Sequence, residues 1–171
     1  MTSAVKPDSE EILKKRWKIY ALIGILFGIF DFFYQELTAQ IGDTSLLRTL
    51  VATGVWLIPA IPVVLCEAKV SQTTWKPALA NVLTWVMAVI SYYLYMGFKL
   101  LIIGQEATQE LHISSYQDPY FWSNWKNVFV GDILGGMFEW LIVAVVGGCL
   151  VGFVVSAAYL GISKARTLKA A

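Results

Sequence analysis

Four long apolar stretches dominate the sequence and decide how every other residue is interpreted. A helix rises about 1.5 Å per residue, so about 20 apolar residues cross the roughly 30 Å hydrocarbon core of a bilayer. The stretches are long enough for this, or nearly so with their flanks, and cover about residues 19–36, 47–66, 78–103 and 133–162. The pattern predicts an all-α chain, an integral membrane four-helix bundle that forms a single domain over residues 1–171.

Two of these stretches carry local irregularities. Pro59 and Pro62 remove backbone donors from the second stretch and predict a bend near residues 57–61. The fourth stretch would extend about 45 Å as a straight helix, which exceeds the hydrocarbon core. We expect it to tilt, to bend at Gly147 and Gly148, or to project beyond the bilayer.

The composition agrees with a chain that has the bilayer as its solvent. The sequence is 57% hydrophobic and carries a formal net charge of +1. This is too apolar for a soluble domain, whose polar surface must face water on all sides. A nearly neutral chain also gives no electrostatic basis for nucleic-acid binding, so the expected partner is the lipid bilayer.

The basic residues divide unequally between the two ends of the stretches. Only Arg48, Lys99 and Lys126 fall on one side. The others precede the first stretch, separate the second from the third, or follow the fourth: Lys6, Lys14, Lys15, Arg16, Lys18, Lys69, Lys76, Lys164, Arg166 and Lys169. By the positive-inside rule both termini are cytoplasmic, and we interpret the first stretch as a retained signal anchor in the plasma membrane.

The connection between the third and fourth stretches is long enough to hold structure. Asp118 and Pro119 provide a helix start. Aromatic residues crowd the second half of the connection, namely Tyr116, Tyr120, Phe121, Trp122, Trp125 and Phe129. This pattern predicts a short interfacial helix at headgroup depth in the outer loop, with a lid or ligand-binding role as the alternative.

Ionisable residues inside apolar stretches are the main functional candidates, because a charge facing lipid costs at least a few kcal/mol. Asp31, Lys99 and Glu139 are the principal three, and we expect the two acids at similar depths near the outer surface. With polar neighbours on the same helical stripes, they predict an outward-facing pocket. Its candidate residues are Asp31, Gln35, Arg48, Tyr92, Tyr95, Lys99, Asp132 and Glu139.

Two interpretations of this constellation stay open. In the first, Asp31 or Glu139 forms a structural ion pair with Lys99 or Arg48, or stays protonated and hydrogen-bonds to a tyrosine. In the second, the acids bind a cation or exchange protons with the outer phase.

Small residues follow two helical stripes that predict close helix–helix packing. Gly24 and Gly28 share a stripe with Asp31, and Gly148, Gly152 and Ser156 form a stripe on the far side of the fourth helix from Glu139. The second stripe either packs against the first or second helix inside the bundle, or docks a second copy or another membrane protein.

Several chemistries find no support in the sequence. His112 is the single histidine and lies in the outer loop, so a multi-histidine metal centre or bis-histidine haem has no ligands. Cys66 and Cys149 are interpreted as small apolar residues, and we expect no catalytic residues, metal or cofactor.

We therefore expect a non-catalytic subunit or small transport-type protein whose outward pocket recognises a small solute, ion or lipid headgroup. The alternatives are an interaction or assembly subunit that docks through the fourth helix and, with less support, a membrane-embedded lipid-modifying enzyme.

Overall fold

The computed structural model describes residues 9–38, 46–103 and 119–170, and these ranges contain helices and turns with no strand. The elements η1 and η2 are helical segments with the wider π-type turn. In chain order the elements are α1 (Ser9–Thr38), α2 (Leu46–Gly54), α3 (Leu57–Ser71), α4 (Trp75–Phe98), η1 (Lys99–Ile103), α5 (Phe121–Lys126), η2 (Asn127–Gly135) and α6 (Gly136–Ala170).

Four helical segments are long and apolar enough to cross a membrane. They are Glu11–Gln35, Leu50–Ser71, Trp75–Ile102 and Asn127–Arg166. This confirms the prediction of an all-α chain with four helices of membrane length. The sequence could predict the helical state and the length of these segments because both follow from local hydropathy.

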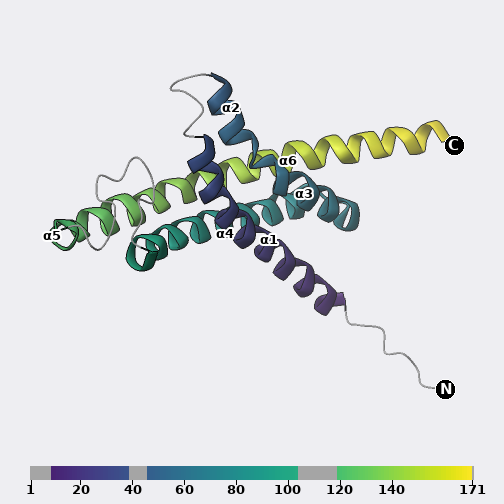
Figure 1. Ribbon diagram of the computed structural model, residues 1–171. Helices are drawn as coiled ribbons and strands as arrows, with labels where there is room; N and C mark the ends of the chain where they lie inside the picture. The colour runs from purple at the N-terminus through teal and green to yellow at the C-terminus, as the bar shows by residue number, and fades with distance from the viewer. Residues whose placement is uncertain (1–8, 39–45, 104–118, 171) are drawn as a thin grey trace, which may run out of the picture.

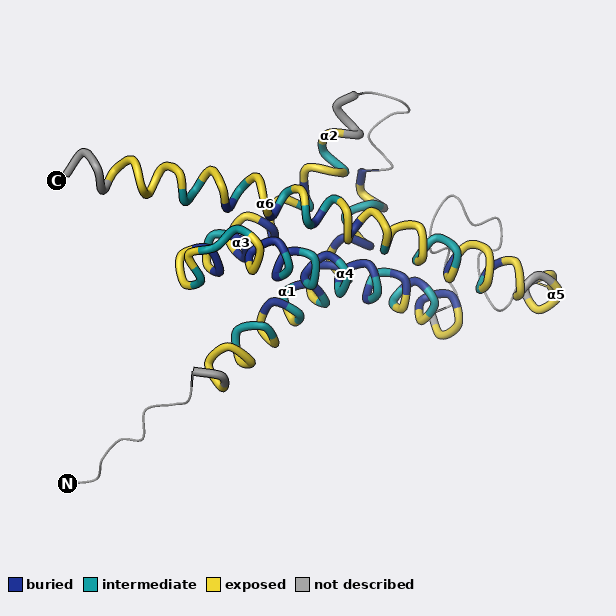
Figure 2. The backbone as a smooth tube through the Cα atoms, turned by 180° about the vertical axis from the view of Figure 1, so that it is seen from behind, coloured by how far each residue is buried: buried dark blue, intermediate teal, exposed yellow. Residues whose placement is uncertain are grey.

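Helix α4 lies at the centre of the bundle, in contact with α1, α3 and α6 (Figure 1). The start of α1, the turn between α3 and α4, and the end of α6 lie at one end of the fold. Helix α6 stays helical through Gly147 and Gly148, and its C-terminal part projects past the other helices (Figure 2). Helix α6 is therefore continuous at the two glycines, and its tilt or projection relative to a bilayer stays a prediction.

Helices α1 and α4 approach closely along the first glycine stripe. A Cβ atom at Gly24 would collide with the backbone oxygen of Thr84, and one at Gly28 with the Ala88 oxygen and the Ser91 hydroxyl. The close approach also lets Ser91 Oγ donate to the carbonyl oxygen of residue 25 at 3.0 Å. Small residues that bring backbones together, with hydroxyls bonding across, are typical of packing between membrane helices.

The second stripe packs on the other side of α4. A Cβ atom at Gly152 would lie 2.5 Å from Ala78 Cα, and one at Gly148 would lie 3.2 Å from Val82 Cα. Ser156 Oγ donates to the carbonyl oxygen of residue 74 at 3.3 Å. All five small residues singled out in the sequence therefore lie at contacts with α4 inside the chain.

The second membrane segment is broken between α2 and α3. Pro59 has no N–H to bond the Val55 carbonyl, which instead accepts from the Ile58 amide at 3.0 Å. The Trp56 amide likewise donates to the Thr53 carbonyl at 3.2 Å, so the chain turns at residues 55–56. The predicted irregularity is present, two residues before the expected range.

The outer connection is described only in part. Residues 104–118, including His112, Tyr116 and Asp118, lie outside the described residues. Beyond them α5 forms over Phe121–Lys126, and it continues into η2 and α6 with no non-helical residue between. Tyr120 and Trp122 are exposed at its start.

Candidate membrane-embedded acid site

The charged residues along each helix delimit its charge-free apolar run, and they show which acids lie inside that run. On α1, Lys18 and Glu36 are separated by eighteen residues, or about 27 Å of helix. Asp31 lies five residues before Glu36, about 7.5 Å inside that boundary. On α6, residues 140–163 carry no charge, so Glu139 stands at the edge of the apolar run. Asp31 and Glu139 therefore have different surroundings.

Asp31 is a buried carboxylate whose partners are neutral. Its side chain is 3% exposed. Gln35 Nε2 donates to Asp31 Oδ1 at 3.2 Å, and the Trp56 side chain also hydrogen-bonds to the carboxyl group. Trp56 reaches it because it stands at the break between α2 and α3, braced edge-on by Phe27 and Trp85 with ring centroids 5.5 and 5.4 Å away. Among the described side chains, Asp31 has no cationic partner.

The aromatic and basic candidates gather around the neighbouring Phe32. The Tyr92 and Tyr95 rings lie 5.5 and 5.1 Å from the Phe32 ring, and Lys99 Nζ lies 4.7 Å above it. Lys99 is 7% exposed. Phe32 is one residue further along α1, about 100° around the helix, so this cluster adjoins Asp31 without contacting its carboxylate through any described hydrogen bond.

The predicted pocket is only partly assembled. Asp132 and Glu139 are exposed and make no described polar contact, so the structure does not bring them together with Asp31. Gly136, one turn before Glu139, faces the Tyr93 ring, while the Glu139 side chain itself is exposed. The backbone of Arg48 lies in α2, and its side chain is outside the described residues.

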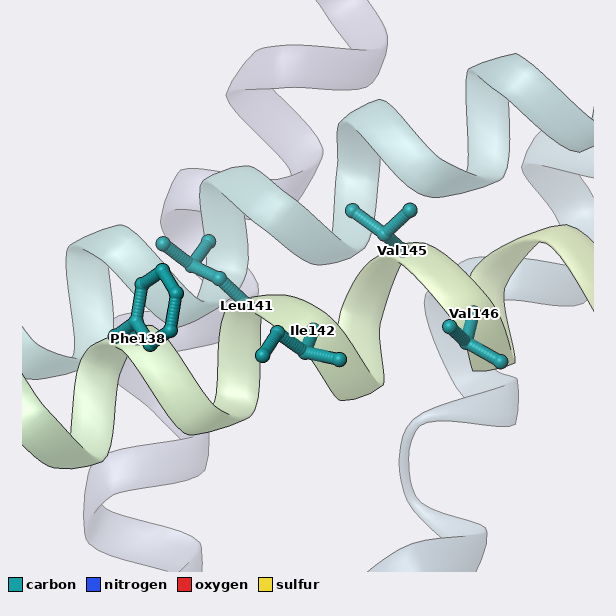
Figure 3. A pocket seen from close by; sticks show the side chains of 5 residues that line it. All are labelled: Phe138, Leu141, Ile142, Val145 and Val146. Atoms are coloured by element: carbon teal, nitrogen blue, oxygen red, sulfur yellow. The ribbon is translucent and has the colours of Figure 1, made fainter.

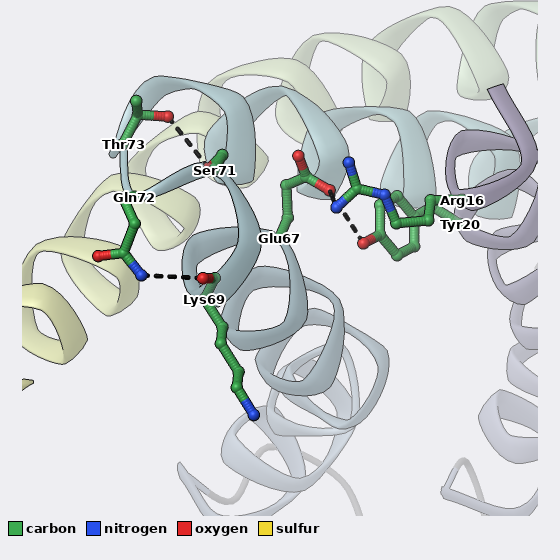
Figure 4. Close-up of polar contacts among 7 residues, drawn as sticks. All are labelled: Arg16, Tyr20, Glu67, Lys69, Ser71, Gln72 and Thr73. Carbon is green, nitrogen blue, oxygen red and sulfur yellow. Dashed lines mark hydrogen bonds and ion pairs between the residues drawn. The ribbon is translucent and has the colours of Figure 1, made fainter. Parts of the chain in front are cut away.

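A second buried acid lies at the other end of the bundle, and sequence reasoning missed it. Glu67 of α3 is 0% exposed. Its Oε2 accepts from the Tyr20 hydroxyl at 3.0 Å and lies 3.4 Å from Arg16 NH1 (Figure 4). Its Oε1 is buried with no hydrogen-bond partner among the described residues.

The sequence carried a weak signal for this contact. Tyr20 and Gly24 continue the Asp31 stripe toward the N-terminus at helical spacing, and Glu67 follows Val63 by one turn. Glu67 was missed because Lys69 lies two residues beyond it, so it resembles an ordinary boundary charge.

Beyond Glu67 in the sequence, α3 ends in a short polar turn. Gln72 adopts the left-handed conformation with φ of 51°, and its amide donates to the Ala68 carbonyl at 2.9 Å. The Gln72 side chain donates to the Lys69 carbonyl at 2.8 Å, and Thr73 donates to Ser71 (Figure 4). These bonds close the helix and reverse the chain into α4.

Two surface grooves of the described chain are apolar. One lies on α6 and is lined by Phe138, Leu141, Ile142, Val145 and Val146 (Figure 3). The other lies between α4 and η2 and is lined by Tyr93, Leu94, Gly97, Phe98, Leu101, Phe129, Ile133 and Leu134. Asp31 lines neither groove. The described residues hold no group of three or more acids, histidines and cysteines that fits a metal ion.

The fold and the buried acids indicate a helical membrane protein with polar groups held inside its bundle. No protein-family model, curated protein or solved structure matches this chain. Any more specific function therefore rests on the residues themselves.

Proposed function

We propose that this chain is a small, non-catalytic membrane protein of the transport type, in which Asp31 takes up and releases a proton from the outer side. The observation that supports it is a carboxyl group 3% exposed whose described partners, Gln35 and Trp56, are both neutral. An ionisable residue inside a membrane segment is rare, and it commonly marks a proton or ion pathway.

The chemistry of the two partners fits a carboxyl group that changes charge. Amide and indole N–H groups donate to the ionised form, yet they supply no fixed positive charge that would hold it ionised. A proton then neutralises Asp31 without rearranging an ion pair. Tyr92, Tyr95 and Lys99 lie around the adjacent Phe32 and, with Gln35, supply polar groups on the outer side of this acid.

The proposal includes an orientation in the plasma membrane. Both termini are cytoplasmic, because the basic residues flank the start of α1, the α3–α4 turn and the end of α6. In this orientation Asp31 lies in the outer half of the bilayer. Helix α5 covers the part of the predicted interfacial helix that lies among the described residues. Exposed Tyr120 and Trp122 suit headgroup depth.

A second candidate is an assembly subunit that docks another membrane protein, or a second copy, through α6. The stripe of Gly148, Gly152 and Ser156 contacts α4, so a partner would have to use the exposed apolar face that includes Phe138 and Ile142 (Figure 3). Lipid chains cover such a face equally well. The Asp31 site is therefore the better-supported basis for a function.

The test is infrared difference spectroscopy of the full chain in lipid nanodiscs as pH is varied. Wild type should show a carboxyl C=O band that changes reversibly with pH, and Asp31→Asn should lose it. Glu139→Gln is the matched control, because it removes an exposed acid and should keep the band. If Asp31→Asn retains the complete wild-type titration at equal folded yield, Asp31 does not exchange protons and the proposal is wrong.

A further inference from the structure

Two buried acids lie on one seam of the bundle, between α1 and α3. Asp31 hydrogen-bonds with Trp56 toward one end, and Glu67 contacts Arg16 and Tyr20 at the other. From Arg16 to Asp31 the helix rises about 22 Å, so the seam spans much of the bilayer. The Asp31 site and the Glu67 cluster thus sit at opposite ends of the same helix contact.

Between the acids the seam is closed by apolar side chains. Nearest Glu67, the Tyr20 ring packs with Val63 and Ala80, and Val63 is 1% exposed. Phe27, Val55 and Ala88 form the next layer toward Asp31. We name the first layer, Tyr20, Val63 and Ala80, the apolar plug.

We infer that Arg16, Tyr20 and Glu67 form a cytoplasmic latch that holds α3 against α1 and keeps the apolar plug closed below Asp31. Figure 4 shows the three side chains converging from the two helices. The inference rests on the proposed function and extends it: a proton at Asp31 reaches the cytoplasmic side only when this seam opens.

The latch has the properties of a contact that can break. Arg16 NH1 and Glu67 Oε2 are 3.4 Å apart, beyond the usual length of a charge-assisted hydrogen bond. Glu67 Oε1, Arg16 Nε and Arg16 NH1 are buried without a hydrogen-bond partner in the described chain. A buried ion pair with unsatisfied atoms stabilises the closed state weakly, while loss of either partner leaves an uncompensated charge.

Helix α3 is also the element best suited to move. It is separated from α2 by the turn at residues 55–56, and Pro62 removes one of its backbone hydrogen bonds. By contrast, α1 is held to α4 through Gly24 and Gly28 in close backbone contact. Opening the latch therefore shifts α3 and leaves the α1–α4 pair intact.

The experiment measures access to the apolar plug with a membrane-impermeant cationic thiol reagent in inside-out vesicles. The reporter is Val63→Cys in a chain that also carries Cys66→Ala and Cys149→Ala. Adding Glu67→Gln should speed modification of the reporter by about tenfold or more, since the open state of a two-state element is normally a minor population. The control reporter is Ala144→Cys, 1% exposed on α6, whose rate should not change.

Other outcomes overturn the latch. An unchanged Val63→Cys rate in folded Glu67→Gln protein shows that the cluster does not close the seam. Faster modification at both reporters shows general loosening instead. If Glu67→Gln does not fold, Arg16→Gln breaks the same pair from a partly exposed side chain and gives the same readout. The reporter rate does not depend on Asp31, so a failed latch and a failed Asp31 titration are separate results.

Discussion

Gly28→Ala tests the packing on which the whole fold depends. The added methyl group would occupy the space of the Ala88 carbonyl oxygen and the Ser91 hydroxyl, so α1 and α4 must separate. Overpacking of this kind costs about 1–3 kcal/mol. Separation also breaks the bond from Ser91 Oγ to the carbonyl of residue 25, and such a bond between membrane helices averages about 0.6 kcal/mol.

The matched control is Gly161→Ala on α6. No atom lies within 4 Å of a Cβ built at Gly161, so this change meets open space. Both substitutions gain the same helix propensity, about 1 kcal/mol, which cancels in the comparison. We expect Gly28→Ala to be less stable than Gly161→Ala by about 1.6–3.6 kcal/mol, the sum of the overpacking and hydrogen-bond losses.

The assay is unfolding of each purified variant in mixed dodecylmaltoside and SDS micelles, followed by circular dichroism. Transition midpoints and slopes give the free energies of unfolding on one scale. If Gly28→Ala unfolds at the same SDS fraction as Gly161→Ala, then α1 and α4 are not in close backbone contact and the arrangement around α4 is wrong.

Three further changes probe single contacts by the same unfolding assay. Asn81→Ala removes the bond from Asn81 Nδ2 to the Gly148 carbonyl at 2.9 Å and should lower stability by about 1 kcal/mol; no loss would mean that this buried amide does not join α4 to α6. Ser91→Ala should lower stability by about 0.6 kcal/mol, and a larger loss than for Gly28→Ala would contradict our ranking of packing above hydrogen bonding. Glu139→Gln should change stability by less than about 0.5 kcal/mol, since the side chain is exposed, and a clear loss would indicate an unseen partner.

Much of the fold follows from the sequence, because helix length and apolarity are local properties. Stretches of about 20 apolar residues must be helical in a bilayer to satisfy their backbone groups, whichever neighbours they have. The glycine stripes were also readable, since Gly24 and Gly28 share one face by helical spacing alone. The sequence did not reveal that the Gly148 stripe packs on α4.

The candidate site depended on tertiary structure. Sequence reasoning grouped Asp31 with Glu139 from their depths, which follow from counting residues. The structure instead pairs Asp31 with Trp56 and turns Glu139 outward. It also buries Glu67 completely, although its neighbours in the sequence resemble an ordinary helix end.

The sequence by itself therefore determined which segments are helical and long and apolar enough to cross a membrane. Tertiary structure alone decided which side of each helix faces a neighbour. The physical reason is clearest in α6, where exposed apolar residues such as Phe138, Val146 and Val154 accompany the buried Ala144. When lipid and helix neighbours are equally apolar, hydrophobicity carries no direction, and close backbone fit with buried polar bonds sets the rotation of each helix.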